Sequence, residues 1–200
     1  PGVFGGDDPG VDDVLRWSDA VIEVSDSPTP ETYKSAGEFW AFLNERIAER
    51  KRKPGDDLLA MLAVTDLDDN EVLLFCVSLL VAGNETTRHL VSLGADALWR
   101  APDQRAALIA AGDDGIAAGI EELLRWVTPI HAFARTALTD VEINGTLIPA
   151  GDFVVMLYAS GNRDEAIFGP TANVLDVTRA VSPTHVAFGF GEHNCLGAPL

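Results

Sequence analysis

The chain has 200 residues, of which 47% are hydrophobic and 22% are charged, and its formal net charge is −17. This composition is typical of a soluble globular protein. The excess of 31 acidic over 14 basic side chains argues against a nucleic-acid partner, whose phosphates require a basic surface. Two cysteines are too few for a disulfide framework, which favours a cytoplasmic location. The longest apolar run, residues 72–83, is shorter than the roughly 20 residues that span a bilayer, so no membrane anchor is expected.

Apolar residues recur at helical spacing through much of the first 127 residues. The longest predicted helix is apolar all round in its first half, so this half should be surrounded by protein. Asp56 or Asp57 is expected to cap the short helix that follows it. Alternating residues around Asn144-Gly145 predict a hairpin, and residues 153–160 predict a further strand. The predicted fold class is mainly α with a small antiparallel β part. Helices are expected over residues 11–24, 31–51, 58–64, 69–99, 103–111 and 114–127.

Cys195 lies in the glycine-rich stretch FGFGEHNCLGAPL, residues 188–200. A thiolate can be a nucleophile, a redox switch or a metal ligand, and a helix opening at Leu196 would stabilise it through free amides. The glycines would let the backbone approach something flat or bulky. His193 suggests a zinc site or a cysteine–histidine nucleophile pair, although the other ligands of a tetrahedral zinc set are missing. The alternative is a buried structural cysteine in a turn.

The stretch LLVAGNETTRHL places small and hydroxyl side chains inside the longest predicted helix, since Ala82, Gly83, Thr86 and Thr87 share one face. A helical glycine costs about 1 kcal/mol relative to alanine, and a threonine hydroxyl beside it can leave a local groove. Glu85 adds a titratable carboxylate. The alternative is a close helix crossing at the Ala82-Gly83 pair, with Glu85 paired to a basic neighbour at the surface.

The stretch EELLR contains Glu122 and Arg125 at i, i+3 spacing. The aliphatic residues of this predicted helix lie on the opposite face. Helical periodicity therefore predicts an exposed ion pair worth a few tenths of a kcal/mol, with no function of its own.

In this order, the three stretches resemble the signature of the cytochrome P450 family, the haem-thiolate monooxygenases. FGFGEHNCLG matches the family's haem-binding loop F-G-x-G-x-H-x-C-x-G at every fixed position. AGNETT matches its oxygen-activating helix motif A-G-x-[DE]-T-[TS], and ELLR matches its E-x-x-R motif. The linking segments FARTALTDVEINGTLIPAG and ASGNRDE resemble the soluble bacterial branch, so the resemblance covers almost the whole chain and implies the cytochrome P450 fold.

The resemblance implies that the protein binds haem b, iron protoporphyrin IX, with Cys195 as the thiolate ligand of the iron. Phe188 would shield the sulfur, and His193 and Arg135 would pair with the haem propionates. The glycines that would let this loop, residues 188–198, pack against the porphyrin are Gly189, Gly191 and Gly197.

The resemblance also gives roles to the long helix. Ala82 and Gly83 would line the distal groove that holds O2 and substrate, and Thr86, with Glu85 behind it, would deliver the protons that oxygen activation requires. The residues that correspond to substrate contacts in the family are Ser78, Val81, Ile130, His131 and Phe133. For the histidine, the alternative is a solvated loop residue.

Glu122 and Arg125 would be buried structural residues on the proximal side, contrary to the helical periodicity. We follow the resemblance here, because a helix packed on two sides can bury its polar face. In the family, a basic residue in a proline-aromatic segment meets this pair. The corresponding segment GPTANVLDV has neither the aromatic nor the basic residue, and Arg179 or His185 is the candidate substitute.

The implied reaction is insertion of one oxygen atom from O2 into a lipophilic small molecule. A ferredoxin or flavodoxin with its reductase would supply electrons and dock near Cys195. A peroxide-using haem-thiolate enzyme is an alternative, although it would not need the proton delivery that Glu85 and Thr86 suggest. The family's domain is roughly twice this length, so we expect an incomplete fold that lacks the amino-terminal half and the end of the domain. A fragment that does not hold haem is therefore a third hypothesis.

Overall fold

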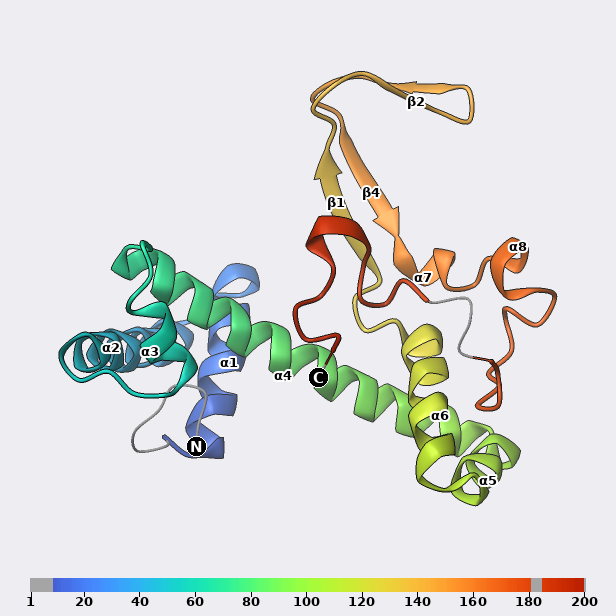
Figure 1. The fold of residues 1–200 in the computed structure, drawn as a ribbon, viewed down its shortest axis with the longest axis horizontal. Helices are drawn as coiled ribbons and strands as arrows, with labels where there is room; N and C mark the ends of the chain where they lie inside the picture. Colours follow the sequence, from blue (N-terminus) through green and yellow to red (C-terminus); the bar gives the residue numbers. More distant parts are fainter. Residues whose placement is uncertain (1–8, 181–184, 200) are drawn as a thin grey trace. The chain divides into compact units, whose positions relative to one another are not determined.

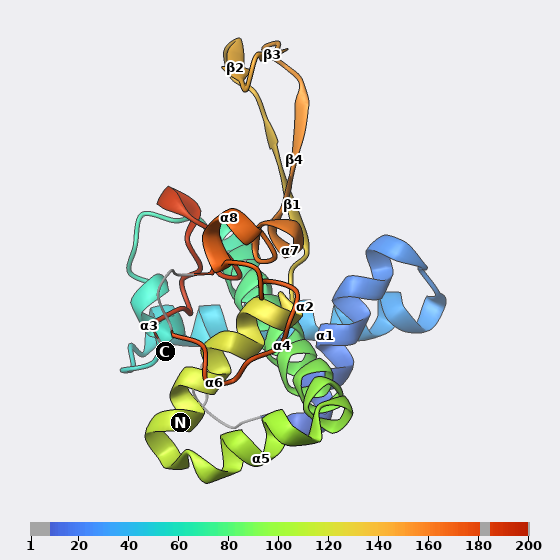
Figure 2. The same ribbon diagram turned by 90° about the vertical axis from the view of Figure 1, so that its right-hand side faces the viewer.

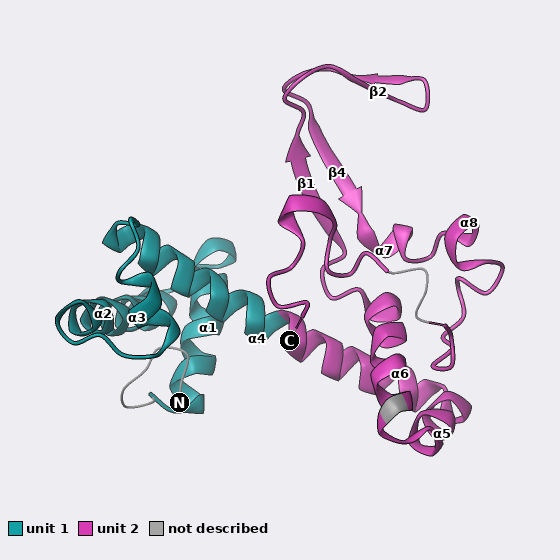
Figure 3. Ribbon diagram, viewed as in Figure 1, with its two compact units in different colours: residues 1–85 teal, residues 86–200 magenta. Residues whose placement is uncertain are grey.

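A computed structural model describes residues 9–180 and 185–199, with no side chain described at position 114. The chain divides into two compact units, residues 1–85 and residues 86–200 (Figure 3). Helix α4 (Asp69–Arg100) is continuous and has residues in both units. The other helices of the first unit are α1 (Val11–Asp26), α2 (Pro30–Arg52) and α3 (Leu58–Leu62) (Figure 1). The second unit contains α5 (Pro102–Ala110), α6 (Gly112–Val127), β1 (Ala132–Thr136), β2 (Val141–Ile143), β3 (Thr146–Ile148), β4 (Phe153–Leu157), α7 (Tyr158–Gly161), α8 (Glu165–Phe168) and a 3-10 turn (Gly191–His193).

Helices α2 and α3 of the first unit begin at side-chain caps. Thr29 and Thr32 form a capping box at the start of α2, where Pro30 occupies the first turn and loses no helical hydrogen bond. At the start of α3, Asp57 Oδ1 accepts the Ala60 N–H at 2.9 Å. Of the two aspartates predicted to cap this helix, Asp57 is the one that does so.

The core of the first unit follows from the i, i+4 spacing of apolar residues on α2. Phe39, Leu43 and Ile47 are at most 2% exposed, and the ring of Trp17 on α1 stacks on Phe39 with centroids 5.3 Å apart. The remaining buried residues of this core come from α3 and α4: Leu59, Val72, Leu73, Cys76 and Val77.

The predicted boundaries of α4 are confirmed to within one residue, but the expected burial of its first half on all sides is wrong. Val72 and Cys76 are 1% exposed, whereas Leu74 is 56% and Phe75 is 37% exposed. The difference arises because the described residues of this unit pack against one face of the helix only.

Two antiparallel pairs of strands, β1 with β4 and β2 with β3, form the β part (Figures 1 and 2). Asn144 and Gly145 turn between β2 and β3 with φ of 50° and 77°, the left-handed values that a two-residue hairpin requires. The predicted hairpin is confirmed. The predicted strand over 153–160 ends at Leu157, and residues 158–161 form the short helix α7 instead.

The predicted fold class, mainly α with a small antiparallel β part, is confirmed. Across residues 9–180 and 185–199, none of the helices combines the length and apolar content needed to cross a membrane.

Replacing Leu43 by Ala should lower the free energy of unfolding of the first unit by about 2–5 kcal/mol, because a fully buried leucine leaves both lost burial and a cavity. The measurement is hydrogen exchange of the α2 amides. The matched control is Leu74→Ala, which removes a leucine that is 56% exposed and should change exchange far less. Equal effects of the two substitutions would contradict this description of the core.

Candidate functional site

Glu122 and Arg125 lie one turn apart on α6, and both are buried, with 3% and 2% of their surface exposed. Arg125 Nε donates to Glu122 Oε2 at 2.7 Å, and Arg125 Nη2 donates to Glu122 Oε1 at 2.8 Å. The exposed pair predicted from helical periodicity is therefore wrong. The physical reason is that segment 162–179 packs over this face of α6, as its hydrogen bonds to both side chains require.

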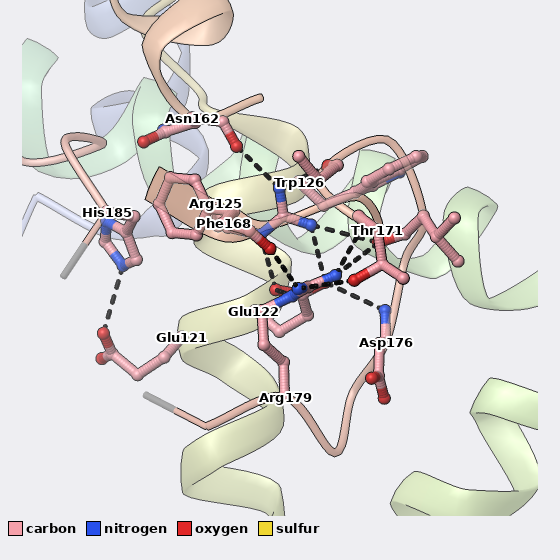
Figure 4. Close-up of polar contacts among 12 residues, drawn as sticks. Glu121, Glu122, Arg125, Trp126, Asn162, Phe168, Thr171, Asp176, Arg179 and His185 are labelled. Atoms are coloured by element: carbon pink, nitrogen blue, oxygen red, sulfur yellow. Dashed lines mark hydrogen bonds and ion pairs between the residues drawn. The ribbon is translucent and has the colours of Figure 1, made fainter. Parts of the chain in front are cut away.

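Arg125 uses its other donors on backbone carbonyls of this segment (Figure 4). Nη1 donates to the carbonyls of Asn162 at 2.6 Å and Ala172 at 2.8 Å, and Nη2 donates to that of Val174 at 3.2 Å. Breaking a buried ion pair by removing one partner costs on the order of 3–5 kcal/mol. The guanidinium therefore stabilises the backbone conformation of segment 162–174 in which these three carbonyls accept its hydrogen bonds.

Glu122 accepts hydrogen bonds from two further groups. Arg179 Nε lies 3.1 Å from Glu122 Oε2, and the Asp176 N–H donates to Glu122 Oε1 at 2.9 Å. Arg179 Nη2 also donates to the Thr171 carbonyl at 2.8 Å. Of the two candidates for the basic partner of the pair, Arg179 is the one that contacts Glu122.

His185 contacts the neighbouring carboxylate instead. Its Nε2 lies 3.1 Å from Glu121 Oε2, so the two consecutive glutamates of α6 hold two different segments (Figure 4). Sequence reasoning missed Glu121, because its pattern of neighbours on α6 gives no sign of a partner 64 residues further along the chain.

Asn162, which is fully buried, joins the end of α6 to the segment that carries Cys195. Its Nδ2 donates to Thr128 Oγ1 at 2.8 Å, and its Oδ1 accepts the Val186 N–H at 2.8 Å. Thr128 adopts a left-handed φ of 44° after α6, and its hydroxyl donates to the Arg125 carbonyl at 2.8 Å. Sequence reasoning did not single out Asn162, because an asparagine in an irregular segment gives no signal of burial.

The backbone around Cys195 folds back on itself. Gly189 and Gly191 have φ of 74° and 77°, values that disfavour a side chain at either position. The Cys195 N–H donates to the Phe188 carbonyl at 2.8 Å, and the Ala198 N–H donates to the Cys195 carbonyl at 3.2 Å. Residues 196–199 form a turn, so the helix predicted after Cys195 is not present in the described residues, and Leu200 lies outside them.

Cys195 is exposed and forms no disulfide, so the alternative of a buried structural cysteine is wrong. Cys76 is the buried cysteine, and burial raises the pKa of its thiol to about 11, which keeps it protonated and unreactive. Of the two cysteines, Cys195 is the one that exposes its thiol.

The surroundings of Cys195 fit a metal ion whose other ligands come from an organic macrocycle. Within the described part of the chain, no three side chains of His, Cys, Asp or Glu gather as a metal site, so the zinc set suggested by His193 is not assembled. One soft thiolate donor suits iron whose remaining ligands come from a porphyrin. A Cβ at Gly191 would meet nothing within 4 Å, and Phe190 and Leu196 are 88% and 73% exposed, which leaves open, apolar surface for a flat ligand. The residues present fit haem.

The candidate residues of α4 fall on either side of the boundary between the two units. Ala82, Gly83 and Glu85 belong to the first unit and Thr86 to the second. Ala82 and Gly83 are exposed and the other two are half-buried, and a Cβ at Gly83 would meet nothing within 4 Å. The helix stays regular through this stretch, so the small face of α4 is open without a break in the backbone ladder.

The two candidate propionate ligands, Arg135 and His193, are both exposed. Arg135 lies on β1, with its guanidinium 5.9 Å from the ring centre of Phe133. His193 ends the 3-10 turn two residues before Cys195. Both roles stay predictions.

The candidate substrate contacts differ in exposure. Ser78 is exposed and donates to the Leu74 carbonyl at 2.8 Å. Val81 and Ile130 are half-buried, and His131 and Phe133 are exposed. These roles also stay predictions.

Replacing Arg125 by Ala should lower the free energy of unfolding of the second unit by about 3–5 kcal/mol, because the buried Glu122 would lose its two hydrogen bonds from the guanidinium and keep only the contact with Arg179, and three backbone carbonyls would lose their donor. Hydrogen exchange of the α6 amides measures this change. The matched control is Arg100→Ala, which removes the exposed pair with Asp96 and should leave the exchange unchanged. If Arg125→Ala had as little effect as the control, the structural role of the pair would be refuted.

Comparisons with known proteins agree with the motifs. Residues 116–200 match the family model of cytochrome P450. The chain is 34% identical over 199 residues to a steroid C26-monooxygenase of Mycolicibacterium smegmatis, an alignment that covers 94% of this chain and 49% of the relative. It is 36% identical over 197 residues to linalool 8-monooxygenase of Pseudomonas putida, covering 94% of this chain and 48% of the relative.

Solved structures give the same result. The ligand-free P450 monooxygenase TamI superposes with a TM-score of 0.84 at 36% identity, covering 98% of this chain and 48% of that one. The chain thus spans about half the length of the curated relatives it matches and corresponds to part of the P450 fold. With the Cys195 loop, the α4 motif and the buried E-x-x-R pair in register, the chain belongs to the bacterial branch of the cytochrome P450 family.

Proposed function

We propose that this chain carries the cysteine ligand and the oxygen-activating helix of a haem-thiolate monooxygenase. The observation that supports this most directly is the exposed, free thiol of Cys195, held in a loop whose base is hydrogen-bonded to the network around α6. An exposed thiol on a fixed backbone can present its sulfur to a metal without rearrangement of the loop.

Haem b, when bound, supplies the activation of O2, so that one oxygen atom enters the substrate and the other leaves as water, with consumption of two electrons and two protons. Cys195 binds the iron as a thiolate. His193 and Arg135 donate charge-assisted hydrogen bonds to the propionates. Phe188 shields the sulfur, and the glycines of the loop admit the porphyrin. The glycines with this role are Gly189, Gly191 and Gly197.

Thr86 and Glu85 move the protons that this reaction consumes. The Thr86 hydroxyl would donate these protons, and the Glu85 carboxylate would restore them to the hydroxyl from solvent. Both side chains are half-buried on α4, next to each other in the sequence. Ala82 and Gly83 leave room on the same helix for O2 and substrate.

The proposed substrate is a lipophilic small molecule. Three of the curated relatives are named for action on a steroid, linalool and vitamin D3, which are all largely apolar. The proposed substrate contacts are Ser78, Val81, Ile130, His131 and Phe133. Apart from the serine and the histidine, these contacts are apolar, as burial of such a ligand requires.

The proposed electron donor is a ferredoxin or flavodoxin with its reductase. It would dock on the face that carries the Cys195 loop, where residues 190–197 are exposed and the path to the sulfur is short. No membrane-bound donor is proposed.

The reduced, CO-treated haem protein should show the long-wavelength Soret band of thiolate ligation, and Cys195→Ala should abolish this band. The matched control is Cys76→Ala, which removes the other cysteine and should keep the band. The spectra are recorded on the chain expressed within its complete coding sequence and, in parallel, on the 200 residues with added hemin. A Cys195→Ala spectrum like that of the unchanged protein would refute the assignment. A band from the complete protein alone would mean that these 200 residues do not hold haem by themselves.

Thr86→Ala should keep the haem spectrum but release most of the reducing equivalents as hydrogen peroxide, because O2 would be reduced without ordered proton delivery. The measurement is the ratio of product formed to electron donor consumed. The matched control is Thr87→Ala, at the exposed neighbouring position. A coupling ratio in Thr86→Ala equal to that of the control would contradict the role of Thr86 and favour a peroxide-using enzyme.

A further inference from the structure

His185 is buried between α6 and the base of the Cys195 loop, with 7% of its surface exposed. Its two ring nitrogens meet different partners. Nε2 lies 3.1 Å from Glu121 Oε2, and Nδ1 lies 3.2 Å from the backbone nitrogen of Ala187. The imidazole thus bridges a helix side chain and a loop amide.

These partners determine the tautomer. A backbone N–H can only donate, so Nδ1 must carry the lone pair that accepts the Ala187 hydrogen. The ring proton of the neutral imidazole is then on Nε2 and is donated to Glu121. A second proton on Nδ1 would face the Ala187 N–H donor to donor, and this hydrogen bond would be lost.

The Ala187 amide precedes the residue that accepts the hydrogen bond of the Cys195 backbone. The next residue, Phe188, accepts the Cys195 N–H at its carbonyl, and its ring centre lies 5.7 Å from that of His185. The Gly189 N–H donates to the Val186 carbonyl at 3.0 Å and closes the turn between them. The backbone that receives the hydrogen bond from Cys195 is therefore the backbone held by His185.

We propose that His185 is a positioning residue for Cys195, and that only its neutral, Nε2-protonated form holds the loop. The inference rests on the proposed function, because positioning Cys195 matters for iron ligation. Val186 is held separately by Asn162, so loss of the His185 contact loosens the loop at Ala187 and Phe188 without releasing its base.

The charged groups around the ring shift the pKa of His185 in opposite directions. Glu121, Glu122, Arg125 and Arg179 line the same small hollow as His185. Burial lowers the pKa of His185 below its ordinary value of 6.5, Glu121 opposes the shift, and the charge on Arg125 adds to it. Because the pKa is lower in the folded state, the loop contact is present above pH 6.5 and is lost as the pH falls through the folded-state value.

Two substitutions separate the two ring nitrogens. His185→Asn puts an amide oxygen near the position of Nδ1, where it can accept the Ala187 N–H, and this side chain cannot titrate. His185→Gln puts an amide nitrogen near the position of Nε2, where it can donate to Glu121, but it leaves the Ala187 N–H without an acceptor. Neither substitution introduces a buried charge.

The experiment measures ring nitrogen chemical shifts and amide exchange by NMR on the full 200-residue chain without haem. At neutral pH we expect the proton on Nε2. Exchange of the Ala187 amide should be about fivefold to tenfold faster in His185→Gln than in His185→Asn, the factor that one ordinary hydrogen bond supports. In the unchanged protein, protection of this amide should fall over the same pH range, below 6.5, in which the ring nitrogen shifts report protonation of His185, and in His185→Asn it should stay constant.

The amides of α6, in the same unit as His185, report whether acid opens that unit as a whole, and His89→Gln controls for removal of an exposed imidazole on α4. A neutral ring with its proton on Nδ1, equal exchange in the two His185 variants, or protection of Ala187 that does not change with pH would each overturn the proposal. These measurements need no haem, so their failure is distinct from failure of the proposed iron ligation, which the CO spectrum tests.

Discussion

The guanidinium of Arg125 is the constraint on which the rest of the second unit depends. A buried cation must be paired and hydrogen-bonded, because its removal from water costs several kcal/mol. Glu122 supplies the charge, and the carbonyls of Asn162, Ala172 and Val174 supply the acceptors. A segment with few regular elements of its own thereby acquires one defined path, which ends near the cysteine loop.

Side chains that do not occupy a fixed position of the three family motifs connect this segment to the loop. Asn162 holds the Val186 amide, and His185 holds the Ala187 amide while Glu121 fixes its ring. The exposed thiol of Cys195 follows these contacts by a few residues. The family signature thus contains the proposed iron ligand, whereas the contacts that hold the backbone of its loop lie in the connecting chain.

Features that depend on near neighbours could be predicted from the sequence. The Asp57 cap, the Asn144-Gly145 turn and the bounds of α4 depend on residues within a few positions of one another. The burial of Glu122 and Arg125 could not be derived from periodicity, because their partners lie 37 to 57 residues further along the chain. For the same reason, the sequence could not show whether Arg179 or His185 contacts Glu122. Two adjacent glutamates are available, and only the path of segment 162–179 determines which basic residue meets which carboxylate.

The central claim is that Cys195 ligates iron from a loop set in place by the α6 network. X-ray absorption at the iron edge of the haem-loaded protein tests it most directly, because the first coordination shell distinguishes sulfur from nitrogen and oxygen. The account predicts one sulfur scatterer in the unchanged protein and none in Cys195→Ala. A first shell of nitrogen and oxygen alone in the unchanged protein would contradict it.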